Sequence, residues 1–551
     1  MKENKIKEAG GCLVMLLLVC FGYAQFYNKA FSGYEAQGKL NWLSASTVIF
    51  VNNWLKEGPW NLKFIMYSLP DSAEFKSLPE RGAYISYPPG AMIPPYMLAR
   101  LLHKNEIGTD FIKRFLTIKF LLDTLLVCLV VYSIFRIIFR LPRANMAIAA
   151  SVASALSWMC LPINLYYLRN VYFSDQGIIT VVLIYILLEM WGELLTRKPS
   201  LKFIYLGLKF VVSLFGALTD YYFLFVLLVS WLVRIIPLIK SKDNFKTVFL
   251  TSLVYVMPVL LGLGLFCLQL SQVENFNNII LDKMIYRISG DMPGGKSKIY
   301  YLISNMHVYH VGWLLIGFLG LSAVLAGKHK TFTLKYGPLL DIMAIIYIPP
   351  VLQVLVLLNH SAIHDFSMLK FALPVMLAFV ISPFWVFDFK KAPEGGIVTR
   401  PENDDGFLIS KSRAIYLIII LSSVFYCGMS ELTLAKYLQK RIGAAESYER
   451  ENLIRSNYGY GDVYFSFTES IPVSPPMRLS VSKKLIHKID SIPEIFEKFP
   501  DLSPGARVLL VVNKNNQDKS RIIIENEQKA VNDAHLSFSS ENYEVYQIGG
   551  P

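Results

Sequence analysis

The sequence predicts an α-helical polytopic membrane protein that ends in a small α/β domain. Of its 551 residues, 54% are hydrophobic and only 17% are charged, whereas soluble domains carry about 25% charged residues. Apolar runs long enough to cross a bilayer recur between residues 11 and 428, and a polar segment of mixed pattern follows them. These observations place most of the chain in lipid and its C-terminal part in water.

The apolar runs predict about eleven transmembrane helices, since each can cross a hydrocarbon core of about 30 Å. The N-terminus is basic but has no convincing cleavage site, so the first run is expected to be a retained helix. We therefore expect a transmembrane domain over 1–428 and a second domain over 429–551. The expected spans lie near 11–27, 115–139, 145–165, 177–195, 203–219, 222–239, 247–270, 311–327, 338–358, 369–387 and 414–428.

Basic residues gather on one side of the predicted membrane, in clusters at 2–7, 136–143, 197–202, 240–246, 328–335 and 390–413. By the positive-inside rule this side is cytoplasmic, and it accounts for the net charge of +13 without a nucleic-acid partner. The long first loop, 28–112, and the C-terminal domain then lie outside the cytoplasm. All six cysteines fall in apolar runs, which excludes a disulfide framework and favours a bacterial inner membrane.

The C-terminal segment has the pattern of a small, external α/β domain. Alternating apolar residues predict strands over 463–467, 507–512 and 543–548. Apolar residues at helical spacing predict helices over 482–499 and 520–531.

The first loop combines a helix with a rigid turn. Apolar residues recur at helical spacing over 40–55, and Gly58-Pro59 ends that helix, which we expect to lie on the membrane surface. Further on, the prolines and glycine of Tyr87-Pro88-Pro89-Gly90 fix the chain in a turn. The turn is either a rigid entry to the next helix or a mount for substrate-binding side chains, namely Arg81, Tyr84 and Tyr87.

Carboxylates at the external ends of spans are the candidates for acid–base chemistry. Glu35 lies at the boundary of water and lipid, where a raised pKa would suit a general base. Asp175 and Asp220, the latter followed by Tyr221, lie at external helix ends. The alternatives are a solvated loop glutamate and two aspartates that cap helices.

Cations on the external side form a second signal. Lys119 and Lys370 lie at external ends of spans, and Arg287 lies in an amphipathic segment of the loop 271–310. Cations near a membrane boundary either contact anionic headgroups or bind a lipid-linked phosphate. His364 lies on the same side and could shape a substrate site.

The spacing of the histidines matches no recognised zinc site, so we expect no metal, and a divalent cation is the alternative. The chain also lacks a Walker loop, a dinucleotide fingerprint and a nucleophile elbow in a usable position. We therefore expect no cofactor.

The layout of the chain resembles the polytopic glycosyltransferases of the C superfamily (GT-C), which include protein O-mannosyltransferases of family 39 and the lipid A aminoarabinose transferase. The resemblance covers the whole chain, and its local motifs are Gly33-Tyr34-Glu35-Ala36, Arg81 to Gly90, Leu218-Thr219-Asp220-Tyr221 and Asn359 to Phe366. It implies a GT-C-like fold and inverting transfer from a polyprenyl-phosphate sugar. By resemblance, Glu35 is the carboxylate base of the first loop, with Asp175 as the rival.

These signals together predict an enzyme of the cell envelope that glycosylates an external glycan, lipid or protein. Lys119, Arg287 and Lys370 would bind the donor phosphate. The sugar site would include Tyr84, Tyr87 and His364, with Arg81, Asp220 and Tyr221 as further substrate contacts. The alternatives are a transporter or lipid flippase, since charges occur within spans, and a glycan polymerase or ligase.

Overall fold

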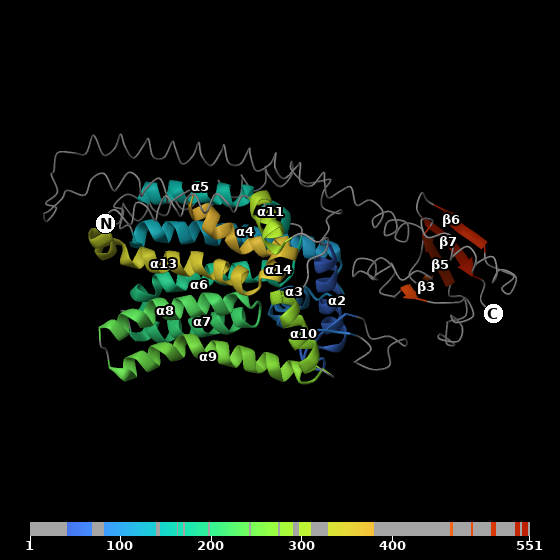
Figure 1. Cartoon of the computed structure of the whole chain (residues 1–551), viewed down its shortest axis with the longest axis horizontal. Coiled ribbons are helices and arrows are strands. Elements are labelled where there is room, and N and C mark those ends of the chain that lie inside the picture. The colour runs from blue at the N-terminus through green and yellow to red at the C-terminus, as the bar shows by residue number, and fades with distance from the viewer. Residues whose placement is uncertain are drawn as a thin grey trace. The chain divides into compact units, whose positions relative to one another are not determined.

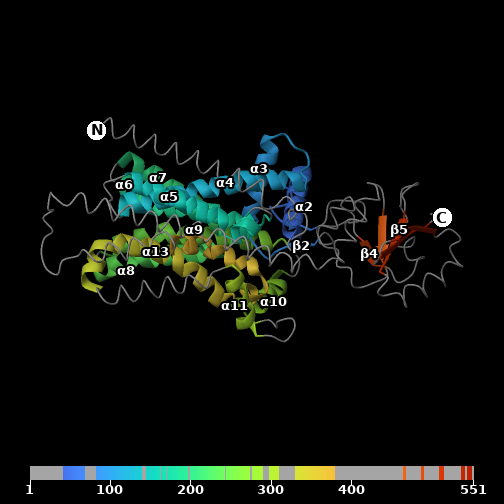
Figure 2. The same cartoon turned by 90° about the horizontal axis from the view of Figure 1, so that it is seen from above.

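The chain forms two compact units in its computed structural model (Figures 1 and 2), and each is described by itself. The first, here called the helical unit, contains the described residues of 85–98 and 110–378. The second unit contains the described residues of 41–84, 99–109 and 463–548. The structure describes residues 41–68, 82–138, 144–161, 163–168, 171–196, 199–241, 244–273, 276–289, 297–309, 329–378, 463–466, 486–488, 508–513, 535–539 and 543–548.

Long apolar helices make up most of the helical unit and run alongside one another in both views (Figures 1 and 2). Within the described residues, five helices are long and apolar enough to cross a membrane, and two shorter apolar helices accompany them. The chain is therefore a multi-pass membrane protein. The helices are α4 (Thr109–Ser133), α5 (Ala144–Cys160), α6 (Ser174–Thr196), α7 (Pro199–Ala217), α8 (Tyr222–Lys240), α9 (Phe245–Leu270) and α13 (His329–Val356).

These helices confirm the predicted spans near 115–139, 177–195, 203–219, 222–239 and 247–270. The runs near 145–165 and 338–358 form helices as well, but their described apolar stretches are shorter, Ala147–Met159 in α5 and Leu340–Val356 in α13. The spans expected near 11–27, 311–327 and 414–428 lie outside the described residues. The span expected near 369–387 is described only as far as residue 378.

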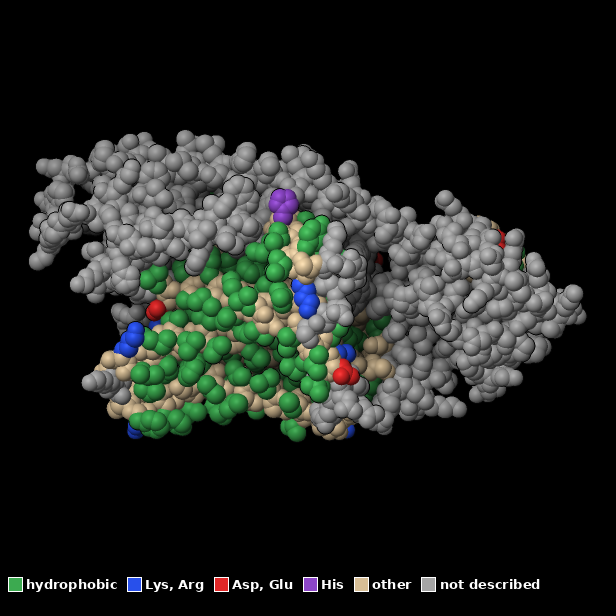
Figure 3. Space-filling model, in the orientation of Figure 1, with side chains coloured by type: hydrophobic (Ala, Val, Ile, Leu, Met, Phe, Trp, Pro, Cys, Tyr) green, Lys and Arg blue, Asp and Glu red, His purple; other side chains and the backbone are tan. Residues whose placement is uncertain are grey.

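Helix α6 lies in the core of the helical unit, and α7 and α9 lie at its surface. In their most apolar windows, 78% of α6 is buried but only 28% of α7 and of α9. The outer faces of the surface helices carry exposed apolar residues such as Phe203, Val211 and Leu260. Apolar side chains accordingly make up much of the described surface of the helical unit seen in Figure 3. Such a surface is stable against lipid hydrocarbon, where every backbone group is satisfied within a helix.

A sharp corner joins α7 to α8. A Cβ atom on Gly216 would lie 2.5 Å from the ring of Phe223, so only glycine lets the start of α8 pack this closely. The corner itself contains Thr219, Asp220 and Tyr221, and the N–H of Phe223 donates to the carbonyl of Asp220 (3.0 Å).

Short elements gather where α6 begins, and this region is called the Asp175 end of the helical unit. The η2 and η6 turns both contact α6, and α14 packs against α10 and α11. The elements are η2 (Pro89–Met92), α3 (Ile93–Leu101), α10 (Phe276–Ser289), α11 (Lys298–Val308), α14 (Leu358–Ile363) and η6 (Asp365–Phe371).

In the second unit, α2 (Asn41–Glu57) packs against a hairpin of β1 (Met66–Tyr67) and β2 (Ala83–Tyr84). The indole N–H of Trp54 donates to the carbonyl of Ile65 (3.1 Å), and Asn53 donates to that of Tyr67 (2.9 Å). The helix predicted over 40–55 is therefore confirmed, and it ends where Gly58 adopts a positive φ of 88°.

The C-terminal part of this unit is a five-stranded sheet of order β4-β3-β5-β7-β6. β3 pairs in parallel with β4 and β5, while β7 runs antiparallel to β5 and β6. The strands are β3 (Val463–Ser466), β4 (Ile486–Lys488), β5 (Val508–Asn513), β6 (His535–Ser539) and β7 (Tyr543–Ile548).

Three of these strands, β3, β5 and β7, confirm the predicted ones. The helix predicted over 482–499 is wrong at Ile486–Lys488, which forms the edge strand β4. A short apolar run satisfies both periodicities, and pairing with β3 decides between them. The helix predicted over 520–531 lies outside the described residues.

Replacing Leu509 by alanine is expected to destabilise the sheet by about 2–5 kcal/mol, because the side chain is fully buried on the central strand β5. Hydrogen–deuterium exchange of the full-length protein should show faster exchange in β5 and β7. The control is Leu536→Ala on the edge strand β6, where the side chain is 52% exposed. Equal exchange in the two variants would contradict the assignment of β5 to the core.

Candidate functional site

Three of the predicted site residues meet as a buried ionic triad. The ammonium of Lys370 lies 2.5 Å from Asp175 Oδ1 and 3.3 Å from Asp220 Oδ2. Asp175 lies in the first turn of α6, Asp220 in the α7–α8 corner and Lys370 in η6. All three side chains are at most 1% exposed. Elements far apart in the sequence are thus joined by one cation.

The triad carries two negative charges and one positive charge. Asp220 is further stabilised because its Oδ1 accepts the backbone N–H of Tyr222 (2.8 Å). Asp175 Oδ2 has no hydrogen-bond partner among the described residues. A buried carboxylate oxygen without a partner is costly, and this cost would fall if the atom bound a proton or a polar donor.

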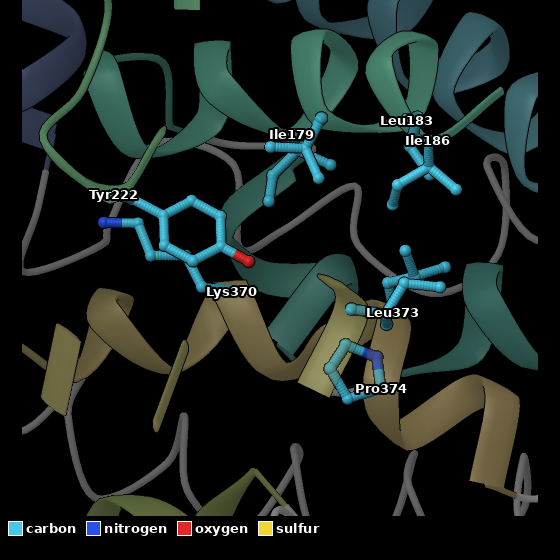
Figure 4. Close-up of a pocket in the computed structure, with 9 residues that line it drawn as sticks. Ile179, Leu183, Ile186, Tyr222, Lys370, Leu373 and Pro374 are labelled. Atoms are coloured by element: carbon cyan, nitrogen blue, oxygen red, sulfur yellow. The ribbon is translucent and has the colours of Figure 1, made fainter. Parts of the chain in front are cut away.

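An apolar pocket borders the triad (Figure 4). Lys370 lies beside the ring of Tyr222, and its amine points away from the apolar side chains of Ile186 and Leu373 (Figure 4). The ammonium is 5.5 Å from the centre of that ring. The apolar wall excludes water from one side of the ion pairs, which strengthens their attraction.

The Tyr-Pro-Pro-Gly turn rests directly on the corner that carries Asp220. The N–H of Gly90 donates to the carbonyl of Leu218 (2.7 Å). A Cβ atom on Gly90 would collide with that oxygen and lie 2.7 Å from Thr219 Oγ1. On the other side, the hydroxyl of Tyr172 donates to the carbonyl of Ala91 (2.7 Å). The turn can therefore pack this closely against the corner only because Gly90 has no side chain.

Two predicted aromatic residues stack beneath Arg287. The rings of Tyr87 and Tyr221 have centroids 5.7 Å apart. The guanidinium carbon of Arg287 lies 4.9 Å from the first ring and 5.7 Å from the second. Burial raises the pKa of Tyr221 to about 12, so its hydroxyl stays protonated at neutral pH. Cation–π contacts of this kind hold a guanidinium in place without neutralising its charge.

Helix α10 directs its cations towards the protein. Arg287 donates to the carbonyl of Ser86 (2.8 Å), and the ammonium of Lys283 lies 3.3 Å from the hydroxyl of the same residue. Among the described side chains of α10, Leu281, Met284, Ile285 and Ile288 are apolar and about half exposed, and Asp282 is exposed as well. Two positive charges therefore face Ser86, which precedes the Tyr-Pro-Pro-Gly turn.

His360, which lies in the Asn359 to Phe366 motif but is not among the predicted site residues, joins this group. His360 Nε2 lies 2.9 Å from the hydroxyl of Tyr87, and its ring is 4.5 Å from that of the predicted His364. Burial holds the pKa of His360 well below its usual range, so the ring is neutral. Its place in the Asn359 to Phe366 motif was the signal that could have identified it.

A third carboxylate at this end is bound by two tyrosines. Asp365 Oδ1 accepts the hydroxyl of Tyr167 (2.6 Å), and Oδ2 accepts that of Tyr309 (3.0 Å). Both tyrosines are fully buried. Asp365 begins η6, the turn that carries Lys370. No local motif marks the tyrosines, because they lie far from Asp365 in the sequence.

Of the other predicted site residues, Lys119 and Tyr84 are described. Lys119 forms a 2.6 Å ion pair with Asp123, whose second oxygen accepts the hydroxyl of Thr180 (2.6 Å). Tyr84 belongs to β2 in the second unit, where its ring is 5.6 Å from Phe50. Glu35 and Arg81 lie outside the described residues. Their proposed roles stay predictions.

Within the described ranges, no group of three or more histidine, cysteine, aspartate or glutamate side chains could hold a metal ion. Arg287 and Lys283 can attract an anion, while Asp175 can accept a proton.

Comparison with solved structures places this arrangement in a known fold. The chain is similar to ArnT from Cupriavidus metallidurans, with a TM-score of 0.55, 11% identity and coverage of 98% of this chain and 99% of that one. It is also similar to the oligosaccharyltransferase AglB from Archaeoglobus fulgidus, with a TM-score of 0.49, 9% identity and coverage of 93% and 70%. No protein-family model matches the sequence, and no curated protein is significantly similar to it.

The likeness to ArnT extends over nearly the whole of both chains. It confirms the predicted GT-C-like fold.

Replacing Gly90 by alanine is expected to displace the α7–α8 corner and lower stability by about 1–3 kcal/mol, because the new methyl group meets the backbone of Leu218. Thermal unfolding of the purified protein in detergent would measure the loss. Gly108→Ala is the matched control, since a Cβ there has no neighbour within 4 Å. Equal stability of the two variants would contradict the close contact.

Asp220 is expected to make stability depend on pH. Burial raises its pKa to about 6, outweighing the attraction of Lys370, from about 3.9 in an unfolded chain. The contribution to stability is therefore present below about pH 4 and is lost as the pH rises through about 6. The unmodified protein should therefore lose stability as the pH rises from about 4 to about 6. The Asp220→Asn variant, whose amide cannot titrate, should not show this loss. A difference in melting temperature that stays constant between pH 4 and 8 would contradict this.

Proposed function

We propose that this protein is a membrane glycosyltransferase that moves a sugar from a polyprenyl-phosphate donor to an external glycan, lipid or protein. The observation that carries the proposal is the joint placement of the Asp175–Lys370–Asp220 triad and the cations of α10 at one end of the helical unit. The GT-C-like fold supports it, because the chain resembles ArnT over nearly its whole length. The Asp175 end would face away from the cytoplasm, in a bacterial inner membrane with a cytoplasmic N-terminus.

In this proposal, the donor phosphate binds to Arg287 and Lys283. Both are cations held near Ser86 and outside the buried triad. A guanidinium binds phosphate through charge-assisted hydrogen bonds, and it stabilises the negative charge that the phosphate gains as it leaves. Lys119 and Lys370 are each paired with carboxylates, so Arg287 is the better phosphate ligand of the three predicted.

Asp175 is suited to serve as the base. Its Oδ1 is held by Lys370, and its Oδ2 is not engaged by any described residue. The acceptor oxygen would attack the anomeric carbon while the bond from that carbon to the phosphate oxygen breaks. The phosphate keeps the bonding electron pair, and the acceptor's proton passes to the carboxylate. Attack from the face opposite the phosphate inverts the anomeric centre. Glu35, in the first loop, is the alternative base.

Replacing the base is expected to lower kcat by about 10²–10⁴-fold, the usual contribution of a positioned general base. Asp175→Asn and Glu35→Gln would be compared in liposomes that contain a polyprenyl-phosphate sugar and an acceptor. Transfer would be measured by the mass of the product. The control is Lys113→Gln, which changes the charge of a half-exposed side chain on α4.

The variant with the larger loss identifies the base. Full transfer by both carboxylate variants would rule out the proposed mechanism. Movement of donor across sealed vesicles without bond formation would indicate a flippase, and long products would indicate a polymerase.

A further inference from the structure

A second ionic cluster lies within the spans, away from the Asp175 end. Glu189 of α6 forms a 2.6 Å ion pair with Lys209 of α7 and a 3.3 Å ion pair with Arg234 of α8. The ammonium of Lys209 also donates to the hydroxyl of Tyr255 of α9 (2.8 Å) and lies 4.0 Å from the centre of its ring. One carboxylate thus links α6 to both arms of the α7–α8 hairpin.

Two members of the cluster are buried within helices that can cross the membrane, where a charge is costly. Glu189 is 1% exposed and Lys209 is 3% exposed, whereas Arg234 is 41% exposed. Removing one member of a buried pair leaves an uncompensated charge, yet apolar residues of similar size would often be as stable as the intact pair. Stability alone therefore does not explain why the chain has the Glu189–Lys209 pair. Apolar contacts are non-directional, whereas an ion pair constrains the relative position of the two side chains.

The two ionic clusters lie on the same face of α6. Glu189 follows Asp175 by about four helical turns, or roughly 21 Å at 1.5 Å per residue. The α7–α8 hairpin lies close to α6 at both levels, since Thr219 of the corner lies beside Gly177 and Tyr205 of α7 lies beside Gly192. Ion pairs join the hairpin to α6 directly at the Glu189 level. At the other level they join Asp220 of the corner to Asp175 through Lys370 of η6.

We infer that Glu189 is a positioning residue that sets the register of the α7–α8 hairpin along α6. Apolar contacts between helices permit small axial shifts, whereas an ion pair of 2.6 Å does not. A shift of the hairpin would move Asp220 relative to Asp175, and Lys370 could then no longer contact both. Glu189, about four helical turns along α6 from Asp175, therefore helps to fix the geometry of the triad.

A disulfide reporter at the Asp175 end tests this inference without relying on activity. A Cβ atom on Gly177 would lie 3.6 Å from Thr219 Cγ2, so cysteines at these two positions would be close neighbours and their cross-linking can be tested. Gly177→Cys and Thr219→Cys would be introduced after the six native cysteines are replaced by alanine. The rate of oxidation then reports the register of α6 and the corner.

The decisive variant is Glu189→Gln combined with Lys209→Met, which removes the buried charges but keeps the side-chain volumes. It should unfold at nearly the parent temperature, whereas Glu189→Gln alone should be less stable. Oxidation should be at least about tenfold slower than in the parent in both variants. The control is Lys240→Gln, an exposed residue of α8, which should oxidise at the parent rate.

Oxidation at the parent rate in the stable double variant would overturn the inference. The effect on catalysis rests on the proposed function: with native cysteines, the double variant should lose kcat about tenfold with an unchanged KM for the donor. Slow oxidation in the variants with no transfer even in the parent would support the positioning role and reject the proposed function.

Discussion

The arrangement of the Asp175 end depends on one cation, Lys370, placed between two carboxylates in a region closed to water. An isolated charge is far too costly to bury there, so the three groups are stable only together. Their elements, the start of α6, the α7–α8 corner and η6, must consequently meet within hydrogen-bonding distance. The rest of this end is built on that constraint.

The neighbouring contacts extend outward from the triad in layers. Gly90 places the Tyr-Pro-Pro-Gly turn against the corner, and the turn places Tyr87 beside Tyr221. Arg287 then covers both rings, and Asp365 fixes η6 through two tyrosine hydroxyls. A rigid carboxylate centre is thus surrounded by aromatic rings and bordered by cations, an order suited to a substrate with a neutral sugar and a charged phosphate.

The sequence alone indicated which residues gather at the Asp175 end, but not which of them contact one another. Charges and aromatic residues at the ends of apolar runs are visible in the sequence, so Asp175, Asp220 and Lys370 could be chosen and placed on one side. Their pairing was not predictable, because it depends on how helices pack. The link from Glu189 to Lys209 was missed for the same reason, and β4 was missed because a short apolar run fits both a helix and a strand.

Helix α10 exposes several apolar side chains while its two described cations contact Ser86. For the proposed donor this has an energetic consequence. Drawing a polyprenyl chain into water costs about 0.8 kcal/mol for each methylene-sized group, which is prohibitive over its full length. A helix with this arrangement removes that cost, because the tail can remain among the acyl chains while only the phosphate passes beneath the helix. Recognition would then be independent of tail length.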